Sequence, residues 1–433
     1  MRRVIKVLLW VVLGPVLLLL LVIAAWVASN GRWADAAPQP VPRELLLRPV
    51  LMAPEHNAFV AVQGLDAPDG ADIAAAGQAA LKGLPPPAGE RLRWPTGELW
   101  NCRASKSDCA RLWHDQAAAL RQELGKAAVL GERCERIAQM PAWEEEAWPL
   151  RPDDGPLATR PFAALPMPRL AGLPSCVRWL GMQAVLETDN SRALALLARA
   201  DDLARRALQG SRSLLGTMIG LSAVENNWVL AGDVIALRGL DRAQLAALLK
   251  PLPALTLSPR NWIPHEAQYG REVMSDLVDP VRGCHQAKDA EGEPAVSWLD
   301  RQLCRFALGS MPEQSRQDSD ALWLQRLSTL PATGPAACEG LQAEPWVETT
   351  PWPAWRNTVT RWLLDVPGSH WKGYVARQID LELLRQTLLA TVQRQPLPGS
   401  VRVERKAEGL SFAGCQARLE LKGMRDPIRL PAL

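Results

Sequence analysis

Two glutamates stand where a carboxylate could carry out acid–base chemistry. Glu225 lies in the polar triplet 225–227, inside a stretch (213–237) whose only other charged residue is Asp233. Helical spacing places Glu225 on an apolar face, so folding would bury its carboxylate. A buried carboxylate must be paired or protonated, and such carboxylates concentrate at functional sites. Glu225 is therefore a candidate general acid or base, or a group that orients a ligand.

The alternative for Glu225 is a structural ion pair. A buried bridge to an arginine would fix the register of neighbouring helices, and we adopt this structural interpretation. The arginines that could pair with it are Arg205, Arg206, Arg212 and Arg271.

Glu266 is the second candidate carboxylate. It belongs to the segment HEAQY (265–269), in which Tyr269 stands where the zinc-binding HExxH motif requires its second histidine. The five histidines are scattered, so we predict neither a metal site nor a cofactor. If Glu225 and Glu266 faced one cleft roughly 5–10 Å apart, they could hydrolyse glycosidic bonds. GxSxG and glycine-rich phosphate loops do not occur, so we lean towards a protein that is not an enzyme.

Eight cysteines indicate an oxidising environment. Their number is even and no CxxC pair occurs, which argues against thioredoxin-like redox chemistry and the common zinc ribbons. In an oxidising compartment they could form up to four disulfides, whose connectivity the sequence leaves open. The candidate disulfide cysteines are Cys102, Cys109, Cys134, Cys176, Cys284, Cys304, Cys338 and Cys415.

Three further patterns each have a structural and a functional interpretation. The 18 tryptophans could stack on glycans or fill the core, and their spread along the chain favours the core. The three glutamates at 144–146 form either a solvated face or a cation site, and we expect the solvated face. The GxxxG motif at 216–220 is typical of close helix packing.

An uncharged apolar stretch (7–28) precedes all of these features. As a helix it would be about 33 Å long, enough for a hydrocarbon core of about 30 Å. Arg2, Arg3 and Lys6 lie before it. The positive-inside rule thus predicts a signal-anchor, a single transmembrane helix with a cytoplasmic N-terminus and the bulk of the chain in the periplasm. A cleaved signal peptide is the alternative, although its apolar core is ordinarily shorter.

The charge balance excludes one class of partner. The formal net charge is +3, and the three basic residues before the apolar stretch account for all of it. The exported part is therefore neutral and lacks the basic surface of a nucleic-acid-binding protein. We predict instead that the chain contacts the lipid bilayer through residues 7–28 and binds an envelope protein or the cell wall.

The chain after the anchor is predicted to be mainly α-helical, an irregular set of antiparallel helix pairs with Pro-rich loops. Helical periodicity is clearest between 176 and 250, where Ser191 suits an N-cap. A long amphipathic helix is expected within 101–140. Alternating residues at 401–404 and 417–421 indicate a small β-hairpin, with Gly409 and Gly414 between its strands and Cys415 available to attach it.

These patterns divide the chain into six predicted segments. They are a cytoplasmic N-terminus (1–6), a transmembrane anchor (7–28), a Pro/Ala linker (29–43), an N-terminal helical and Pro-rich region (44–175), a main α-helical domain (176–395) and a β-hairpin tail packed on the helices (396–433).

Two short stretches, WNCRASKSDCARLW (100–113) and NAFVAVQGLDAP (57–68), carry a resemblance. In them the sequence resembles uncharacterised proteobacterial single-pass envelope proteins, a likeness that covers a small part of the chain and implies no activity. The predicted function is thus a membrane-anchored periplasmic binding or structural protein at the bacterial inner membrane. The alternative is an envelope hydrolase that acts on peptidoglycan or other glycans through paired carboxylates.

Overall fold

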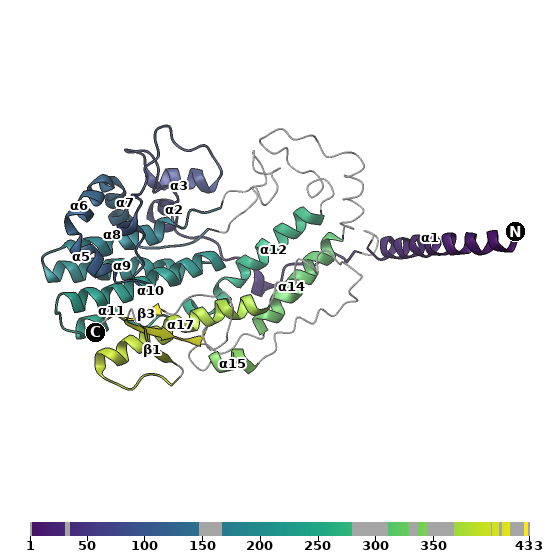
Figure 1. Cartoon of the computed structure of the whole chain (residues 1–433). Coiled ribbons are helices and arrows are strands. Elements are labelled where there is room, and N and C mark those ends of the chain that lie inside the picture. The colour runs from purple at the N-terminus through teal and green to yellow at the C-terminus, as the bar shows by residue number, and fades with distance from the viewer. Residues whose placement is uncertain are drawn as a thin grey trace.

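A computed structural model of the chain describes residues 2–30, 35–146, 167–278, 311–328, 337–343, 368–399, 401–406, 409–415 and 428–431. These residues are mainly helical and include one small antiparallel sheet. Helix α1 (Arg2–Asn30) projects from one end of a helical body, as Figure 1 shows.

The predicted fold class is wrong on one point, the transmembrane helix. Residues 7–28 lie in α1, yet no helix among the described residues has both the length and the apolar character that a membrane crossing requires. The leucines of α1 from Leu13 to Leu21 are exposed, since this part of the helix packs against little else.

Three consecutive helices form the centre of the body and pack against one another: α8 (Gly172–Leu186), α9 (Asn190–Gly210) and α10 (Leu214–Leu237). Helix α10 is apolar nearly all round and is therefore buried on most of its surface. Asp189, not Ser191, is the N-cap of α9, because its carboxylate accepts the backbone N–H groups of Ser191 (2.7 Å) and Arg192 (3.1 Å).

Gly220 sets the distance between α9 and α10. A Cβ atom at this position would lie 2.9 Å from the Cα atom of Leu208, closer than side chains approach a backbone. One glycine of the GxxxG motif therefore provides close helix packing, as the motif predicts.

Shorter helices precede this centre and cover one end of it. They are α2 (Ala58–Gln63), α3 (Ile73–Leu81), α4 (Glu98–Asn101), α5 (Cys109–Asp115), α6 (Ala117–Lys126) and α7 (Ala128–Gln139). The long helix expected within 101–140 is thus divided, because the backbone leaves helical geometry at Gln116 and Ala127.

The elements that follow α10 lie partly on its opposite side and partly beyond its N-terminal end, towards α1 (Figure 1). They are α11 (Ala243–Leu248), the 3-10 turns η5 (Ala254–Leu257) and η6 (Pro259–Asn261), α12 (Ile263–Val278), α14 (Pro312–Ser328), α15 (Ala337–Ala343), α17 (Gly368–Gln393), β1 (Arg402–Lys406), β2 (Gly409–Ala413) and β3 (Ile428–Arg429).

The C-terminal sheet has the strand order β1-β2-β3, and both pairs of neighbours are antiparallel. The first predicted hairpin strand, 401–404, overlaps β1. Its partner differs from the prediction, because Gly409 begins β2 instead of lying in the turn. The expected second strand, 417–421, lies outside the described residues.

Three disulfides cross-link this fold, one within a short loop and two between separate elements. Cys102–Cys109 closes the loop before α5, Cys134–Cys176 links α7 to α8, and Cys338–Cys415 attaches the sheet to α15. All described cysteines are therefore paired, whereas Cys284 and Cys304 lie outside the described residues. Disulfides that close long loops stabilise the fold chiefly by restricting the unfolded chain.

The buried residues form a large core and a small one. The large core runs through α2, α5, α7–α10 and α17, and most of the described tryptophans pack inside one of the two cores. The small core joins the turn η2 (Arg43–Leu45) to α12 and α14 through Leu45, Trp262, Ile263, Ala267, Trp323 and Leu327. The extended segment 46–52, which we call the strap, leads from the small core towards the large one.

Candidate functional site

Glu225 is buried in α10, with 3% of its surface exposed. Its Oε2 atom lies 3.9 Å from Nη2 of Arg377, which α17 contributes. The carboxylate thus faces an arginine, as the structural interpretation expects, but not one of those named from the sequence. Those four make other contacts: Arg205 with Asp201 and two backbone carbonyls, Arg206 with Ala138, Arg212 with the strap, and Arg271 with Asp320.

Glu266 lies in the first turn of α12 and contacts the start of another helix, α10. Its Oε1 atom accepts a hydrogen bond from the backbone N–H of Leu214 (2.9 Å), the first residue of α10. The same atom lies 3.5 Å from Nδ1 of His265. A carboxylate in this position stabilises the exposed N–H groups and the positive end of the helix dipole.

The two candidate carboxylates do not share a cleft. Glu266 contacts the first residue of α10, and Glu225 lies farther along the same helix by about 16 Å of helical rise. Glycoside hydrolysis requires two carboxyl groups about 5–10 Å apart around one bond. The described residues also contain no group of histidine, cysteine, aspartate or glutamate side chains that could hold a metal ion.

Glu145 belongs to the glutamate triplet at 144–146, within which the sequence patterns gave it no separate role. Its side chain is fully buried and accepts hydrogen bonds from the backbone N–H of Arg212 (2.6 Å) and from both the N–H (3.1 Å) and the hydroxyl (2.5 Å) of Ser213. Gly216 makes room for it, since a Cβ atom there would lie 2.4 Å from Oε2 of Glu145. The expectation of a solvated face at 144–146 is therefore wrong for Glu145, which caps α10 from another segment.

Glu144 points the other way and holds the strap. Its Oε2 atom accepts the backbone N–H groups of Leu51 (2.7 Å) and Met52 (3.2 Å) and lies 3.8 Å from Nη2 of Arg212. Arg212 in turn donates to the backbone carbonyls of Arg48 and Pro49, the second at 3.2 Å. The strap is thus fixed from both sides by one carboxylate and one guanidinium group.

A cavity of about 810 Å³ opens beside these contacts, between the strap, the end of α9 and the start of α12. Its charged wall consists of five arginines and two glutamates, together with the nearly buried His265. The arginines are Arg43, Arg48, Arg206, Arg212 and Arg260, and the glutamates are Glu44 and Glu144. The formal charge of the wall is therefore +3 with His265 neutral.

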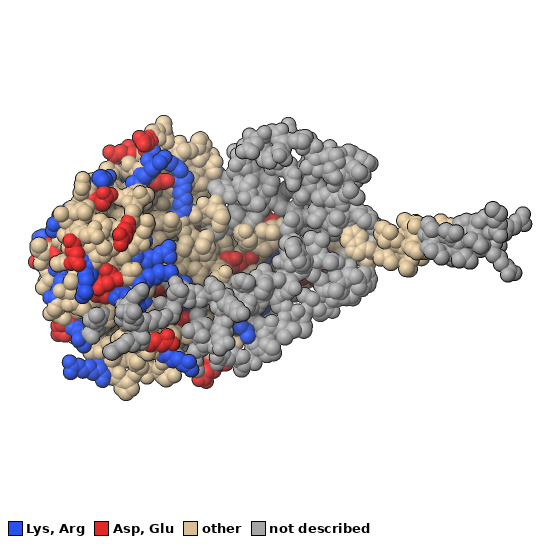
Figure 2. Space-filling model, viewed as in Figure 1, with Lys and Arg blue, Asp and Glu red and all other residues tan. Residues whose placement is uncertain are grey.

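This local excess contrasts with the face of the molecule that Figure 2 shows. Figure 2 shows basic and acidic side chains intermingled over the coloured part of the visible face, without a large field of one sign. The net charge of the whole chain does not reveal this excess, because acidic residues elsewhere in the sequence offset the cavity arginines. The five cavity arginines are spread from position 43 to position 260, and no local sequence motif indicates that they come together.

Two donors in the cavity wall lack acceptors. Trp143 is 4% exposed, and neither its Nε1 group nor the Nε group of Arg206 has a hydrogen-bond partner among the described residues. Burial lowers the pKa of Arg206 and of Arg212, and for Arg212 the nearby Glu144 and Glu145 oppose this shift. Buried N–H donors without partners are costly, but these two nitrogen atoms have almost no accessible surface, so they do not themselves offer donors to a ligand in the cavity.

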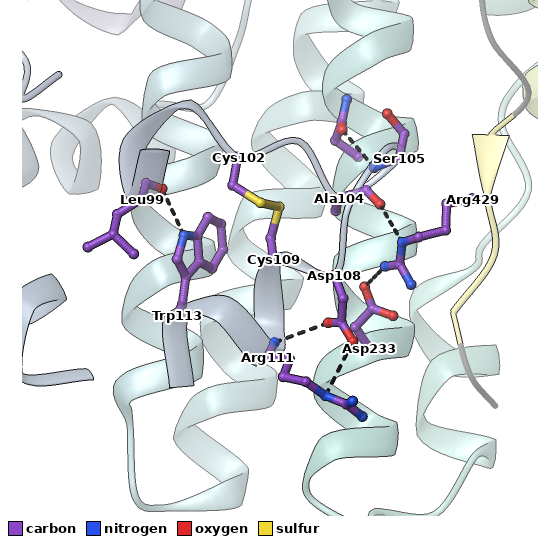
Figure 3. Close-up of a disulfide and its surroundings, with 11 residues drawn as sticks. Leu99, Cys102, Ala104, Ser105, Asp108, Cys109, Arg111, Trp113, Asp233 and Arg429 are labelled. Atoms are coloured by element: carbon purple, nitrogen blue, oxygen red, sulfur yellow. Dashed lines mark hydrogen bonds and ion pairs between the residues drawn. A yellow bond between two sulfur atoms is a disulfide. The ribbon is translucent and has the colours of Figure 1, made fainter. Parts of the chain in front are cut away.

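A second charged cluster lies beside the Cys102–Cys109 disulfide (Figure 3). Arg429 of β3 pairs with Asp233 of α10 and donates through Nε to the carbonyl of Ala104 (3.2 Å). Burial is the main reason that the pKa of Asp233 rises from 3.8 to about 7, and Arg429 limits the rise. Each guanidinium contact here has an acceptor within the chain, so this cluster is structural.

No protein-family model, curated protein or solved structure matches the chain. The resemblance to single-pass envelope proteins therefore stays a prediction.

Proposed function

We propose that this protein is a binding protein whose cavity takes a small organic or inorganic anion. One observation carries the proposal, the concentration of five arginines against two glutamates around a cavity of about 810 Å³. Pockets that hold small ligands commonly measure about 300–1,000 Å³. The guanidinium group offers several N–H donors in one plane, a geometry that suits carboxylate, sulfate and phosphate groups.

The arginines divide into two kinds that suit different tasks. Arg206 and Arg212 are partly buried and anchored on backbone carbonyls, so their positions are set before a ligand arrives. Arg43 and Arg48 are exposed, and their side chains form no ion pair within the described part of the chain. The first pair supplies a fixed positive wall, and the second pair can close on a bound anion.

The three observed disulfides support function in an oxidising compartment, such as the predicted periplasm. The inner-membrane location and an envelope or cell-wall partner stay predictions. Anion binding in the cavity does not depend on either of them.

Calorimetric titration of sulfate into the full chain in low-salt buffer tests the proposal. We expect saturable binding that Arg43→Ala and Arg48→Ala each weaken by about fivefold, since each removes a charged donor from the cavity. Arg121→Ala, an exposed arginine of α6 away from the cavity, is the matched control and should leave the affinity unchanged. Equal losses in all three variants would show a nonspecific charge effect and contradict the proposal.

A further inference from the structure

The cavity carries a carboxylate of its own beside its most anchored arginine. Glu144 Oε2 lies 3.8 Å from Nη2 of Arg212, within ion-pair range but beyond hydrogen-bonding distance. The Glu144 side chain is 25% exposed and the Arg212 side chain 18%, so water screens this pair only in part. Glu144 therefore offsets the charge of Arg212 without taking any of its hydrogen-bond donors.

Glu144 stays in place for a reason independent of Arg212. The backbone N–H groups of Leu51 and Met52 donate to the same Oε2 atom and hold it at the edge of the cavity. Arg212 is held independently by the strap carbonyls of Arg48 and Pro49. An anion could thus approach Arg212 while both side chains keep the contacts that fix the strap.

We propose that Glu144 is the resident counter-ion of the cavity, an internal competitor that sets its affinity for external anions. This inference rests on anion binding in the cavity. While the cavity is empty, Glu144 neutralises part of the charge of Arg212. When an anion binds, the negative charge of Glu144 repels it and keeps its binding weak enough to be readily reversed.

The repulsion has a signature that a purely structural role lacks. The Coulomb energy of a ligand in the field of Glu144 is proportional to the charge of the ligand. Removing that field should therefore raise the affinity for a dianion by about the square of the factor found for a monoanion. Loss of a strap contact alone would instead lower the affinity for both ligands, or change both affinities by the same factor.

Glu144→Gln is the direct test, because the amide keeps an oxygen that can accept from Leu51 and Met52. In low-salt titrations of the full chain we expect about threefold tighter acetate binding and about tenfold tighter sulfate binding. Glu144→Asp keeps the charge but retracts it from Arg212, and should give a smaller gain in the same direction.

The control is Glu132→Gln, which removes an exposed carboxylate of α7 that does not line the cavity. We therefore expect a change below about twofold for either ligand. Unchanged or weaker sulfate binding by folded Glu144→Gln and Glu144→Asp would overturn the inference and leave the proposed function standing. Absence of sulfate binding by both the unaltered chain and Glu144→Gln would overturn the proposed function itself.

Discussion

Two regions of the molecule contain partly buried arginines. They differ in the groups that accept hydrogen bonds from the guanidinium and balance its charge. Arg429 has a nearly buried carboxylate, Asp233, as its direct partner and a carbonyl as its second acceptor. Arg212 donates to carbonyls of the strap, and the nearest cavity carboxylate, Glu144, stands 3.8 Å away. The first region is electrostatically complete within the chain, whereas the cavity keeps an excess of positive charge. A complete pair stabilises the fold, and an unmatched charge is available to a ligand.

The largest effect that follows concerns the complete pair. Arg429→Ala would leave Asp233 buried without its partner, so we expect the free energy of unfolding at pH 8 to fall by about 3 kcal/mol. Urea denaturation followed by circular dichroism measures this change. Arg121→Ala should alter stability by less than about 0.5 kcal/mol. A loss below about 1 kcal/mol for Arg429→Ala would show that the pair adds little to the fold.

Gly216→Ala probes the cavity region, where Glu145 caps the start of α10. Its added methyl group would collide with the Glu145 carboxylate, and we expect a loss of about 2 kcal/mol in unfolding free energy. Gly125→Ala in α6 is the matched control, because no atom lies within 4 Å of its new Cβ. That substitution should stabilise the protein by up to about 1 kcal/mol. Equal effects in the two variants would contradict the described packing around Glu145.

A comparable effect depends on pH and concerns buried carboxylates away from the cavity. Burial raises the pKa of Asp201, like that of Asp233, from 3.8 to about 7, although Asp201 accepts a hydrogen bond from Trp228 Nε1 (2.8 Å). The folded state thus binds these protons more tightly than the unfolded state. The stability they contribute is complete below about pH 4 and is lost as the pH rises through about 7.

Asp201→Asn removes one of these groups and should flatten the pH dependence. Between pH 5 and pH 8 we expect the unfolding free energy of the unaltered chain to fall, relative to that of the variant, by on the order of 2 kcal/mol. Urea denaturation at several pH values checks this. Parallel pH profiles for the two proteins would mean that Asp201 titrates near its ordinary pKa.

Local sequence signals predicted the helical centre and missed the contacts that cross the chain. The apolar run after Ser213 predicted α10 because burial on all sides leaves a continuous pattern. Asp189 and Ser191 are both good capping residues two positions apart, so sequence alone could not decide which begins α9. Arg377 and the cavity arginines lie far from their counterparts in sequence, and only tertiary packing brings them close. The length of an apolar run likewise predicted a membrane-spanning helix that the described residues do not bear out.

Titration of sulfate into the full chain and into the double variant Arg43→Ala/Arg48→Ala tests the central claim most directly. If the cavity binds anions, the unaltered chain shows saturable binding at one site, and the double variant binds at least about twentyfold more weakly with its fold unchanged. The absence of saturable binding by the unaltered chain, or an affinity that the double substitution leaves intact, would contradict the account.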